Sequence, residues 1–177
     1  MALELRSAGG EQEVEQARTL MREYGRHLAS HPAGPEHFCL TGFEEELAGL
    51  PGAYAAPGAL LLAFDDGEAA GCVALRPLPE QDGEQRMELK RLWVRPAFRG
   101  RGLGRRLMEA GIAHAHSMGA NALLLDTVPA AMPEANRLYG ELGFQPTKRY
   151  NQLDVEGVAF FRLELAARRA GGGGQNL

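Results

Sequence analysis

Glycines and arginines alternate in one short stretch of the chain, residues 99–106. The preceding residues, Met87–Val94, alternate apolar and polar side chains in part and predict a strand. From Leu103 to Met118 apolar residues recur at helical spacing. The glycines are therefore expected at a helix N-terminus, where unpaired backbone N–H groups and the helix dipole attract an anion. The residues concerned are Arg99, Gly100, Arg101, Gly102, Gly104, Arg105 and Arg106.

The arginines of this stretch strengthen the expectation of an anion site. Guanidinium groups bind phosphate oxygens in a forked geometry, and glycines leave no Cβ to hold a diphosphate away from the backbone. Two other phosphate loops do not fit: a dinucleotide-binding turn needs glycines at its first, third and sixth positions, and a P-loop needs Lys followed by Ser or Thr. The stretch predicts a diphosphate ligand. The alternative, a solvated charged face, is disfavoured by the glycine spacing.

The stretch resembles the acyl-CoA site of the GNAT superfamily of N-acetyltransferases. Their signature is Arg or Gln, two residues, Gly, one residue, then Gly or Ala, at the start of a helix that follows a strand. Arg99, Gly102 and Gly104 match it. A second landmark of the family, a helix with Leu-Tyr that ends in Gly-Phe, is similar to residues 134–144. The resemblance extends over most of the chain, from about residue 3 to residue 165.

The remaining pattern agrees with the fold that the resemblance implies. Periodicity predicts, in order, a strand, two helices, three strands, a helix, a strand, a helix and two strands. The other predicted elements are Leu3–Ser7, Glu11–Ser30, Phe43–Leu50, Ala59–Phe64, Ala69–Arg76, Ala122–Thr127, Pro133–Leu142, Phe144–Tyr150 and Val158–Leu165. The expected fold class is α/β (α+β), a GNAT-like mixed, mostly antiparallel sheet of about seven strands with helices on both faces. The resemblance adds a V-shaped splay between the two parallel strands that end at Val94 and Thr127.

The resemblance implies acetyl-CoA as co-substrate and no metal. Asn136 is expected to bond the pantetheine arm or a phosphate, and a backbone N–H near Val94 to polarise the thioester. The implied cofactor-binding residues are Val94, Arg99, Gly100, Arg101, Gly102, Leu103, Gly104, Arg105 and Asn136. Many family members also place an asparagine seven residues before the tyrosine of the second landmark; here that position is Met132.

The family mechanism is direct attack of an amine on the thioester in a ternary complex, which requires groups that move protons. Tyr139 occupies the tyrosine position of the second landmark and is implied to protonate the departing thiolate; a packed aromatic residue is the alternative. Glu88 is the candidate base, because its even spacing from Val94 predicts that both lie on one face of the strand. A structural ion pair between Glu88 and Lys90 is an equal alternative. Further candidates for the acceptor pocket are Asp126, Tyr150 and Asn151.

Size and composition narrow the remaining possibilities. The chain has 177 residues and a net charge of −4, which predicts one domain over residues 1–168 and disfavours nucleic-acid binding. No apolar run reaches the roughly 18 residues of a membrane helix, and the N-terminus lacks the apolar segment of a signal peptide, so a cytoplasmic location without membrane binding is expected. The glycine-rich tail, residues 169–177, is expected to be disordered.

Cysteines and histidines do not predict a metal site. Cys39 and Cys72 are too few for a disulfide framework or a ligand cluster. His27, His31 and His37 surround the exit of the first long helix at a spacing that matches no metal site. They are therefore interpreted as loop histidines.

The acceptor implied by the resemblance is a primary amine of a small molecule or peptide. The segments expected to recognise it, residues 30–58 and 147–157, are compatible with polyamines, aminoglycosides, amino acids or protein N-termini. Homodimers are common in the family, and the dimer stays open here. A non-catalytic acyl-CoA-binding or regulatory module is the alternative function, against which Tyr139 and Glu88 favour the enzyme.

Overall fold

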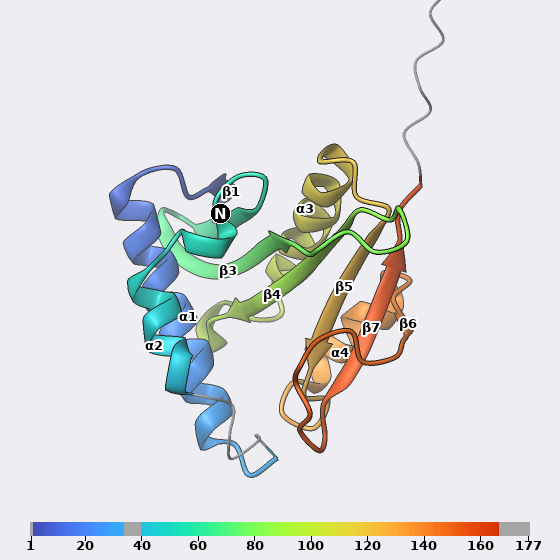
Figure 1. The fold of residues 1–177 in the computed structure, drawn as a ribbon. Helices are drawn as coiled ribbons and strands as arrows, with labels where there is room; N and C mark the ends of the chain where they lie inside the picture. The colour runs from blue at the N-terminus through green and yellow to red at the C-terminus, as the bar shows by residue number, and fades with distance from the viewer. Residues whose placement is uncertain (1, 34–39, 167–177) are drawn as a thin grey trace, which may run out of the picture.

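The computed structural model of the protein describes residues 2–33 and 40–166 (Figure 1). Its elements are β1 (Leu3–Ser7), α1 (Glu11–Ser30), α2 (Leu40–Ala48), β2 (Ala59–Asp65), β3 (Glu68–Pro77), β4 (Arg86–Val94), α3 (Leu103–Ser117), β5 (Ala122–Thr127), α4 (Pro133–Glu141), β6 (Gln145–Pro146) and β7 (Ala159–Glu164). Short 3₁₀ helices occupy Gly52–Tyr54 and Pro96–Phe98. The predicted order of strands and helices is confirmed, while the predicted tail, residues 169–177, lies outside the described residues.

One seven-stranded sheet runs through the molecule in the order β1-β2-β3-β4-β5-β7-β6. Every neighbouring pair is antiparallel except β4 and β5. That parallel pair covers three positions, from Arg86 opposite Ala122 to Glu88 opposite Leu124, although both strands continue beyond it. Figure 1 shows the two strands diverging from there. The mixed, mostly antiparallel sheet with a V-shaped splay is thus confirmed.

Helices cover both faces of the sheet and form separate halves of the core. On one face Leu107 and Met108 of α3 are fully buried, and Tyr139 of α4 belongs to the same cluster. On the other face Leu20 of α1 and Leu47 of α2 are fully buried against β2, β3 and β4 (Figure 1). Each such leucine contributes about 1.5–3 kcal/mol through burial. The α1 stripe that the sequence predicts is therefore the face that fixes this helix on the sheet.

β4 carries a β-bulge at Arg91, whose backbone φ is 61°, and the register between β3 and β4 shifts there. A bulge adds one residue to a strand, so the alternation of faces changes phase beyond it. Met87 and Leu89 face α3, and Glu88 between them points to the opposite face. After the bulge Val94 packs on the α3 side. The prediction that even spacing places Glu88 and Val94 on one face is therefore wrong.

The predicted strand Phe144–Tyr150 is much shorter than expected, because only Gln145 and Pro146 pair with β7. Pro146 has no N–H to donate, which limits the ladder at this position. The chain then continues as a long connection that returns to the sheet at β7. Among the described residues no helix has the length and apolar character needed to span a membrane.

Candidate active site

The glycine stretch forms the turn between β4 and α3. Gly100 and Gly102 have φ values of 75° and 77°, which a residue with a Cβ adopts only under strain, and Gly102 is the N-cap of α3. No atom lies within 4 Å of where a Cβ on either glycine would stand. The glycines are therefore required by the backbone conformation, and they leave the first N–H groups of α3 open on that side.

A cavity of about 490 Å³ lies beside this turn, between β4 with the start of α3 and the segment that joins β5 to α4. Seven of the residues implied to bind the cofactor line it: Val94, Arg99, Gly100, Gly102, Leu103, Gly104 and Arg105. Arg99 also donates from Nε to the carbonyl oxygen of Val94 at 3.0 Å. Arg105 pairs with Glu141, which lines the same cavity. The turn, the arginines and the end of β4 thus share one groove.

Arg101 is directed away from this groove. Its guanidinium donates to the carboxylate of Asp65 at the end of β2, whose side chain is only 2% exposed. In the described part of the chain Asp65 Oδ1 is buried without a hydrogen-bond partner, and Arg101 compensates the carboxylate through Oδ2. Arg101 therefore acts on the fold, and its implied contact with a cofactor stays a prediction.

The side-chain amide of Asn136, on α4, has a hydrogen-bonded nitrogen and an oxygen that accepts no described hydrogen bond. Its Nδ2 donates to Thr127 Oγ1 at 3.0 Å and to the carbonyl oxygen of Met132 at 2.8 Å. Because a carbonyl oxygen only accepts, these contacts fix which end of the amide is nitrogen. The remaining Oδ1 is buried and has no hydrogen-bond partner within residues 2–33 and 40–166. An unpaired buried acceptor fits an N–H donor of a ligand, such as a pantetheine amide, and does not fit a phosphate.

Tyr139 is 5% exposed and packs between aromatic rings. The ring centroids of Phe144 and Phe161 lie 5.9 and 6.3 Å from its own. Burial raises the pKa of the Tyr139 phenol far above its ordinary value, and a contact with the Thr127 hydroxyl only partly offsets this. The hydroxyl therefore stays protonated at neutral pH, and the same shift makes it a weaker acid than a free phenol.

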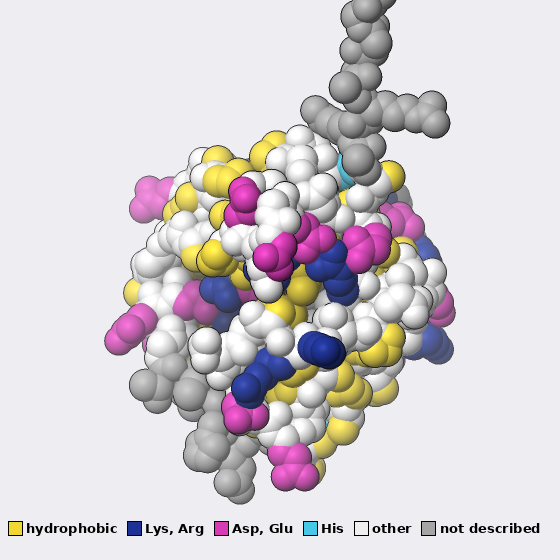
Figure 2. Space-filling model, turned by 45° about the vertical axis from the view of Figure 1, so that its right-hand side comes forward, with side chains coloured by type: hydrophobic (Ala, Val, Ile, Leu, Met, Phe, Trp, Pro, Cys, Tyr) yellow, Lys and Arg dark blue, Asp and Glu magenta, His cyan; other side chains and the backbone are white. Residues whose placement is uncertain are grey.

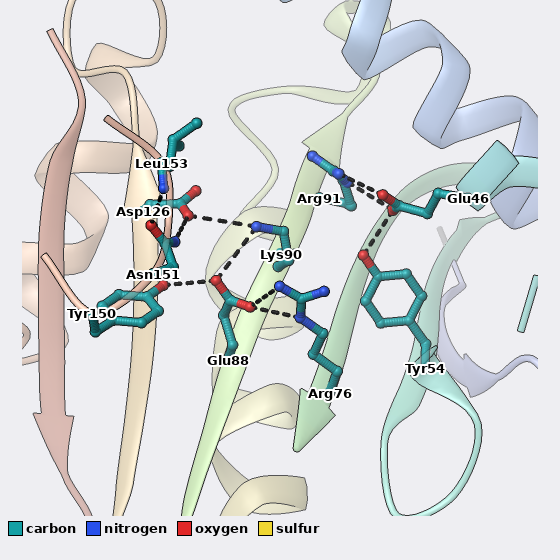
Figure 3. Close-up of polar contacts among 10 residues, drawn as sticks. All are labelled: Glu46, Tyr54, Arg76, Glu88, Lys90, Arg91, Asp126, Tyr150, Asn151 and Leu153. Carbon is teal, nitrogen blue, oxygen red and sulfur yellow. Dashed lines mark hydrogen bonds and ion pairs between the residues drawn. The ribbon is translucent and has the colours of Figure 1, made fainter. Parts of the chain in front are cut away.

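Glu88 lies at the centre of a polar network on the other face of the sheet (Figure 3). Its carboxylate is 0% exposed; it accepts from Arg76 Nε at 2.6 Å and Tyr150 Oη at 2.8 Å, and lies 3.4 Å from Lys90 Nζ. Burial raises the pKa of Glu88, but the Lys90 and Arg76 charges and the Tyr150 hydrogen bond outweigh it, so the pKa lies below its ordinary value. Glu88 is a fixed anion with both oxygens occupied.

The network continues across to β5 and brings together the three further candidates for the acceptor pocket. Lys90 Nζ lies 3.5 Å from Asp126 Oδ2, to which Asn151 Nδ2 also donates at 2.7 Å. Tyr150 joins through Glu88, and Figure 3 shows these side chains converging from β4, β5 and the connection before β7. Arg76 was missed by sequence reasoning, since its place opposite Glu88 depends on the pairing of β3 with β4.

A second ion pair lies on the same face, nearer to α2. Arg91 Nε and Nη2 donate to the Glu46 carboxylate at 2.9 and 2.6 Å, and Tyr54 Oη donates to it at 2.7 Å (Figure 3). Burial raises the pKa of Glu46, but the bonds and charge of Arg91 lower it overall. Figure 2 shows basic and acidic side chains next to each other around a hollow with a hydrophobic floor. The charges on this side of the molecule are therefore largely paired.

His27 and His31 also line the cavity, which corrects the interpretation of His27 as a loop histidine. His27 belongs to α1; its Nε2 lies 3.3 Å from the carbonyl oxygen of Ala131, and its ring centroid is 5.1 Å from that of Trp93. His31 follows α1, and its Nδ1 accepts from the Ala33 N–H at 3.0 Å. His37 lies outside the described residues. Within the described part of the chain no three His, Cys, Asp or Glu side chains are grouped as metal ligands.

Cys72 takes no part in the groove. Cys72 lies on β3, its side chain is buried in the core on the α1 side of the sheet, and Sγ lies 3.4 Å from the carbonyl oxygen of Arg91. Burial raises the pKa of the Cys72 thiol to about 12, so the thiolate is scarce at neutral pH. Cys39 lies outside the described residues.

Comparison with known sequences shows to which class of protein the chain belongs. The chain matches the model of the acetyltransferase (GNAT) family over residues 15–144. It is 32% identical over 157 residues to an uncharacterised N-acetyltransferase of Schizosaccharomyces pombe, a match that covers 88% of this chain and 90% of that protein. The chain belongs to the GNAT family of acetyltransferases and is an acyltransferase by class.

Solved structures have the same fold at lower sequence identity. A GNAT-family acetyltransferase from Staphylococcus aureus Mu50 superimposes with a TM-score of 0.73 at 18% identity, over 93% of this chain and 100% of that one. YncA from Salmonella typhimurium, solved with its cofactor acetyl-CoA, gives a TM-score of 0.70 at 19% identity, over 98% and 99% of the two chains. Both likenesses support the assignment of the fold.

Proposed function

We propose that this protein transfers an acetyl group from acetyl-CoA to a primary amine of a small molecule or peptide, by direct attack within a ternary complex. The observation that carries the proposal is the groove in which the open N-terminus of α3, two arginines and the end of β4 meet. Backbone N–H groups at a helix N-terminus with adjacent guanidinium groups suit a diphosphate. CoA contains this group.

Asn136 does not itself line the cavity, but its neighbours Ala135 and Arg137 do, and its side chain fits the rest of such a co-substrate. Asn136 Oδ1 would accept from a pantetheine amide, which would satisfy a buried acceptor that has no partner among the described residues. A backbone N–H near Val94 would hold the thioester oxygen. When bound, acetyl-CoA supplies an activated acyl group, and the protein's own work is to orient the reactants and move protons.

Tyr139 is proposed to protonate the sulfur that leaves. A phenol is protonated at neutral pH, as this role requires, and Leu138 beside it lines the cavity although Tyr139 itself does not. Asp126, Tyr150 and Asn151 are proposed to surround the acceptor, because they converge on the side of the sheet opposite α3 (Figure 3). Glu88 is proposed to hold this side together as a buried anion, which is the structural alternative of the two roles considered for it.

Calorimetry with acetyl-CoA tests the proposal directly. We expect binding by the wild type and its loss in Gly102→Glu, which adds bulk and negative charge at the phosphate turn. Gly119→Glu is the matched control, because Gly119 has a φ of 81°, lies near the end of α3 and also faces open space. It carries the same backbone strain and charge and should bind as the wild type does. Equal binding by both variants would reject the turn as the site.

Release of free thiol, measured over a panel of primary amines, then separates an enzyme from a non-catalytic acyl-CoA-binding module. Turnover with one class of amine supports the enzyme and names its acceptor, whereas binding without turnover favours the module. The cytoplasmic location, the single domain over residues 1–168 and the homodimer stay predictions. Cell fractionation, limited proteolysis and sedimentation analysis would check them.

A further inference from the structure

His27 lies on α1 and lines the cavity, whereas the glycine turn lies between β4 and α3. Its Nε2 lies 3.3 Å from the carbonyl oxygen of Ala131, in the segment between β5 and α4. Its ring lies against Trp93 of β4, with 5.1 Å between the centroids. The imidazole is therefore held from both arms of the V, and it lines the same cavity as Val94 and the glycine turn.

The hydrogen bond to the Ala131 carbonyl oxygen determines the tautomer of the neutral His27 ring. A carbonyl oxygen only accepts hydrogen bonds, so Nε2 of His27 must carry the proton, and Nδ1 then carries the lone pair. His31 differs, because its Nδ1 already accepts from the backbone N–H of Ala33 at 3.0 Å. Of the two imidazoles that line the cavity, only His27 has a basic nitrogen that its described hydrogen bonds do not engage.

Glu88 is poorly placed for the same work. It lies on the same face of β4 as Trp93 but, unlike Trp93 and His27, it does not line the cavity. Its two oxygens are bound by Arg76, Lys90 and Tyr150. A carboxylate that is fully buried and held by three partners cannot exchange a proton with an incoming amine without breaking that network. The base of the reaction is therefore expected elsewhere.

We propose that His27 is the general base of acetyl transfer and accepts the acceptor's proton on Nδ1. This proposal rests on the proposed function. Nδ1 takes one proton from the ammonium of the acceptor, and the freed amine nitrogen forms a bond to the thioester carbonyl carbon. The carbon–sulfur bond breaks with its electron pair on sulfur, and the second proton of the nitrogen reaches sulfur through Tyr139. Nδ1 then releases its proton to solvent, and the neutral imidazole is restored.

The charged and titratable groups around the imidazole are themselves paired or at the edge of the cavity. On α1 they are Glu23, Tyr24 and His31; Glu23 accepts from Trp93 Nε1 at 3.3 Å and pairs with Arg95 at 2.8 Å. From β4 and the turn, Arg99 lies over the Trp93 ring at 5.0 Å, and Glu134 lines the cavity from α4.

Two variants separate a basic role from a structural one. His27→Gln retains an amide N–H that can donate to the Ala131 carbonyl oxygen but has no nitrogen that titrates. His116→Gln makes the same change at an imidazole of α3 that does not line the cavity and whose Nε2 lies 2.9 Å from the carbonyl oxygen of Ala166. Both should bind acetyl-CoA within about twofold of the wild type, while His27→Gln alone loses about 100-fold or more in kcat/KM toward the best amine of the panel.

The pH profile and NMR provide readouts that a packing role would not change. In the wild type and in His116→Gln, kcat/KM should rise with pH along a limb that His27→Gln lacks, because an imidazole accepts a proton only in its neutral form. Long-range ¹H–¹⁵N spectra of the histidines, with and without acetyl-CoA, need no acceptor. They should show neutral His27 protonated on Nε2, with a titration midpoint that matches the kinetic limb.

Three results would overturn the proposal: a limb that persists in His27→Gln, a neutral His27 protonated on Nδ1, or acetyl-CoA binding that falls as far as kcat/KM. Failure of the proposed function has a different signature, namely wild-type protein that does not bind acetyl-CoA. If acetyl-CoA binds but no amine in the panel reacts, the NMR result decides, because an Nδ1-protonated ring is not a base at that nitrogen.

Discussion

The Lys90 ammonium and the Asp126 carboxylate lie 3.5 Å apart, two residues along each strand beyond the last pair that joins β4 to β5. Lys90 is also 3.4 Å from Glu88, so a single cation sits between two carboxylates at the point where the V opens. The side chains of Lys90 and Asp126 are only 13% and 12% exposed. An ion pair between side chains therefore connects β4 and β5 where their backbone pairing ends, on the side where the acceptor is proposed to bind.

Lys90→Met should lower the free energy of unfolding by about 2 kcal/mol, because it leaves two poorly solvated carboxylates without their shared cation. The loss should stay below that of a fully isolated buried pair, since Glu88 keeps Arg76. Urea unfolding at pH 7 measures it. Arg137→Met is the control: Arg137 is 78% exposed and lies 3.7 Å from Glu141, so its removal should change stability by less than about 0.5 kcal/mol. Equal losses would contradict a special role for Lys90.

The acid sensitivity of the fold should depend on Glu88. The folded-state pKa of Glu88 lies below its ordinary value of 4.5, so the unfolded chain binds the proton more readily. The resulting stabilisation is fully present above about pH 4.5 and is lost as the pH falls through the lower folded-state value.

Glu88→Gln removes this titration. The variant should be less stable than the wild type at pH 7, by about 1–3 kcal/mol, and the difference should shrink as the pH is lowered below 4. Denaturant titrations across the pH range measure both quantities. Glu45→Gln, a change at an exposed glutamate of α2, should leave the wild-type curve unchanged. A gap between wild type and Glu88→Gln that stays constant with pH would contradict the linkage.

Variants of Arg101 and Arg99 should affect different quantities, stability for Arg101 and cofactor affinity for Arg99, although the two residues are close in sequence. Arg101→Met leaves the buried Asp65 without its cation, which should cost about 1–3 kcal/mol of stability, and should change the acetyl-CoA Kd little. Arg99→Met removes a guanidinium that lines the groove and should weaken acetyl-CoA with little change in stability. Thermal unfolding and calorimetry on both variants give the comparison. The opposite pattern would place Arg101 at the phosphates.

Asn136 should contribute to affinity through the pantetheine arm alone. Asn136→Ala removes the open Oδ1, and the acetyl-CoA Kd should rise about 5- to 10-fold, the effect of one neutral hydrogen bond. Adenosine 3′,5′-diphosphate carries phosphates but no pantetheine, so its affinity should not change. An equal loss for both ligands would instead assign Asn136 to the phosphate end or to the fold.

The parts of this site that the sequence predicted are those set by local rules. The strand, the glycine turn and the start of α3 follow from periodicity and from glycines that the backbone requires at Gly100 and Gly102. The helix α4 begins at Pro133 and is followed by Gly143 with a φ of 92°, as local signals for helix ends predict. These features need no knowledge of the rest of the chain.

The parts that the sequence did not predict depend on contacts between distant segments. The bulge at Arg91 has no local signal, since arginine is an unusual residue at positive φ. Because of this bulge Glu88 and Val94 lie on opposite faces of β4 instead of the same face. Tyr150 reaches Glu88 across 62 positions of the sequence. The sequence pattern indicates a loop histidine at His27, and the packing of α1 against Trp93 is what brings it to the cavity.

Tyr139 and Tyr150 are both buried tyrosines, and their phenylalanine variants should behave differently. Tyr139→Phe keeps the packing against Phe144 and Phe161, so its stability should change by less than about 1 kcal/mol. Without the hydroxyl, kcat should fall about 100-fold at unchanged acetyl-CoA Kd, because the leaving sulfur loses its proton donor. Tyr150→Phe removes the 2.8 Å hydrogen bond to Glu88, and stability should fall by about 1 kcal/mol. Thiol-release kinetics with unfolding curves on both variants decide between the roles: a kcat that survives Tyr139→Phe would leave Tyr139 a packing residue, since nothing but its hydroxyl has been removed.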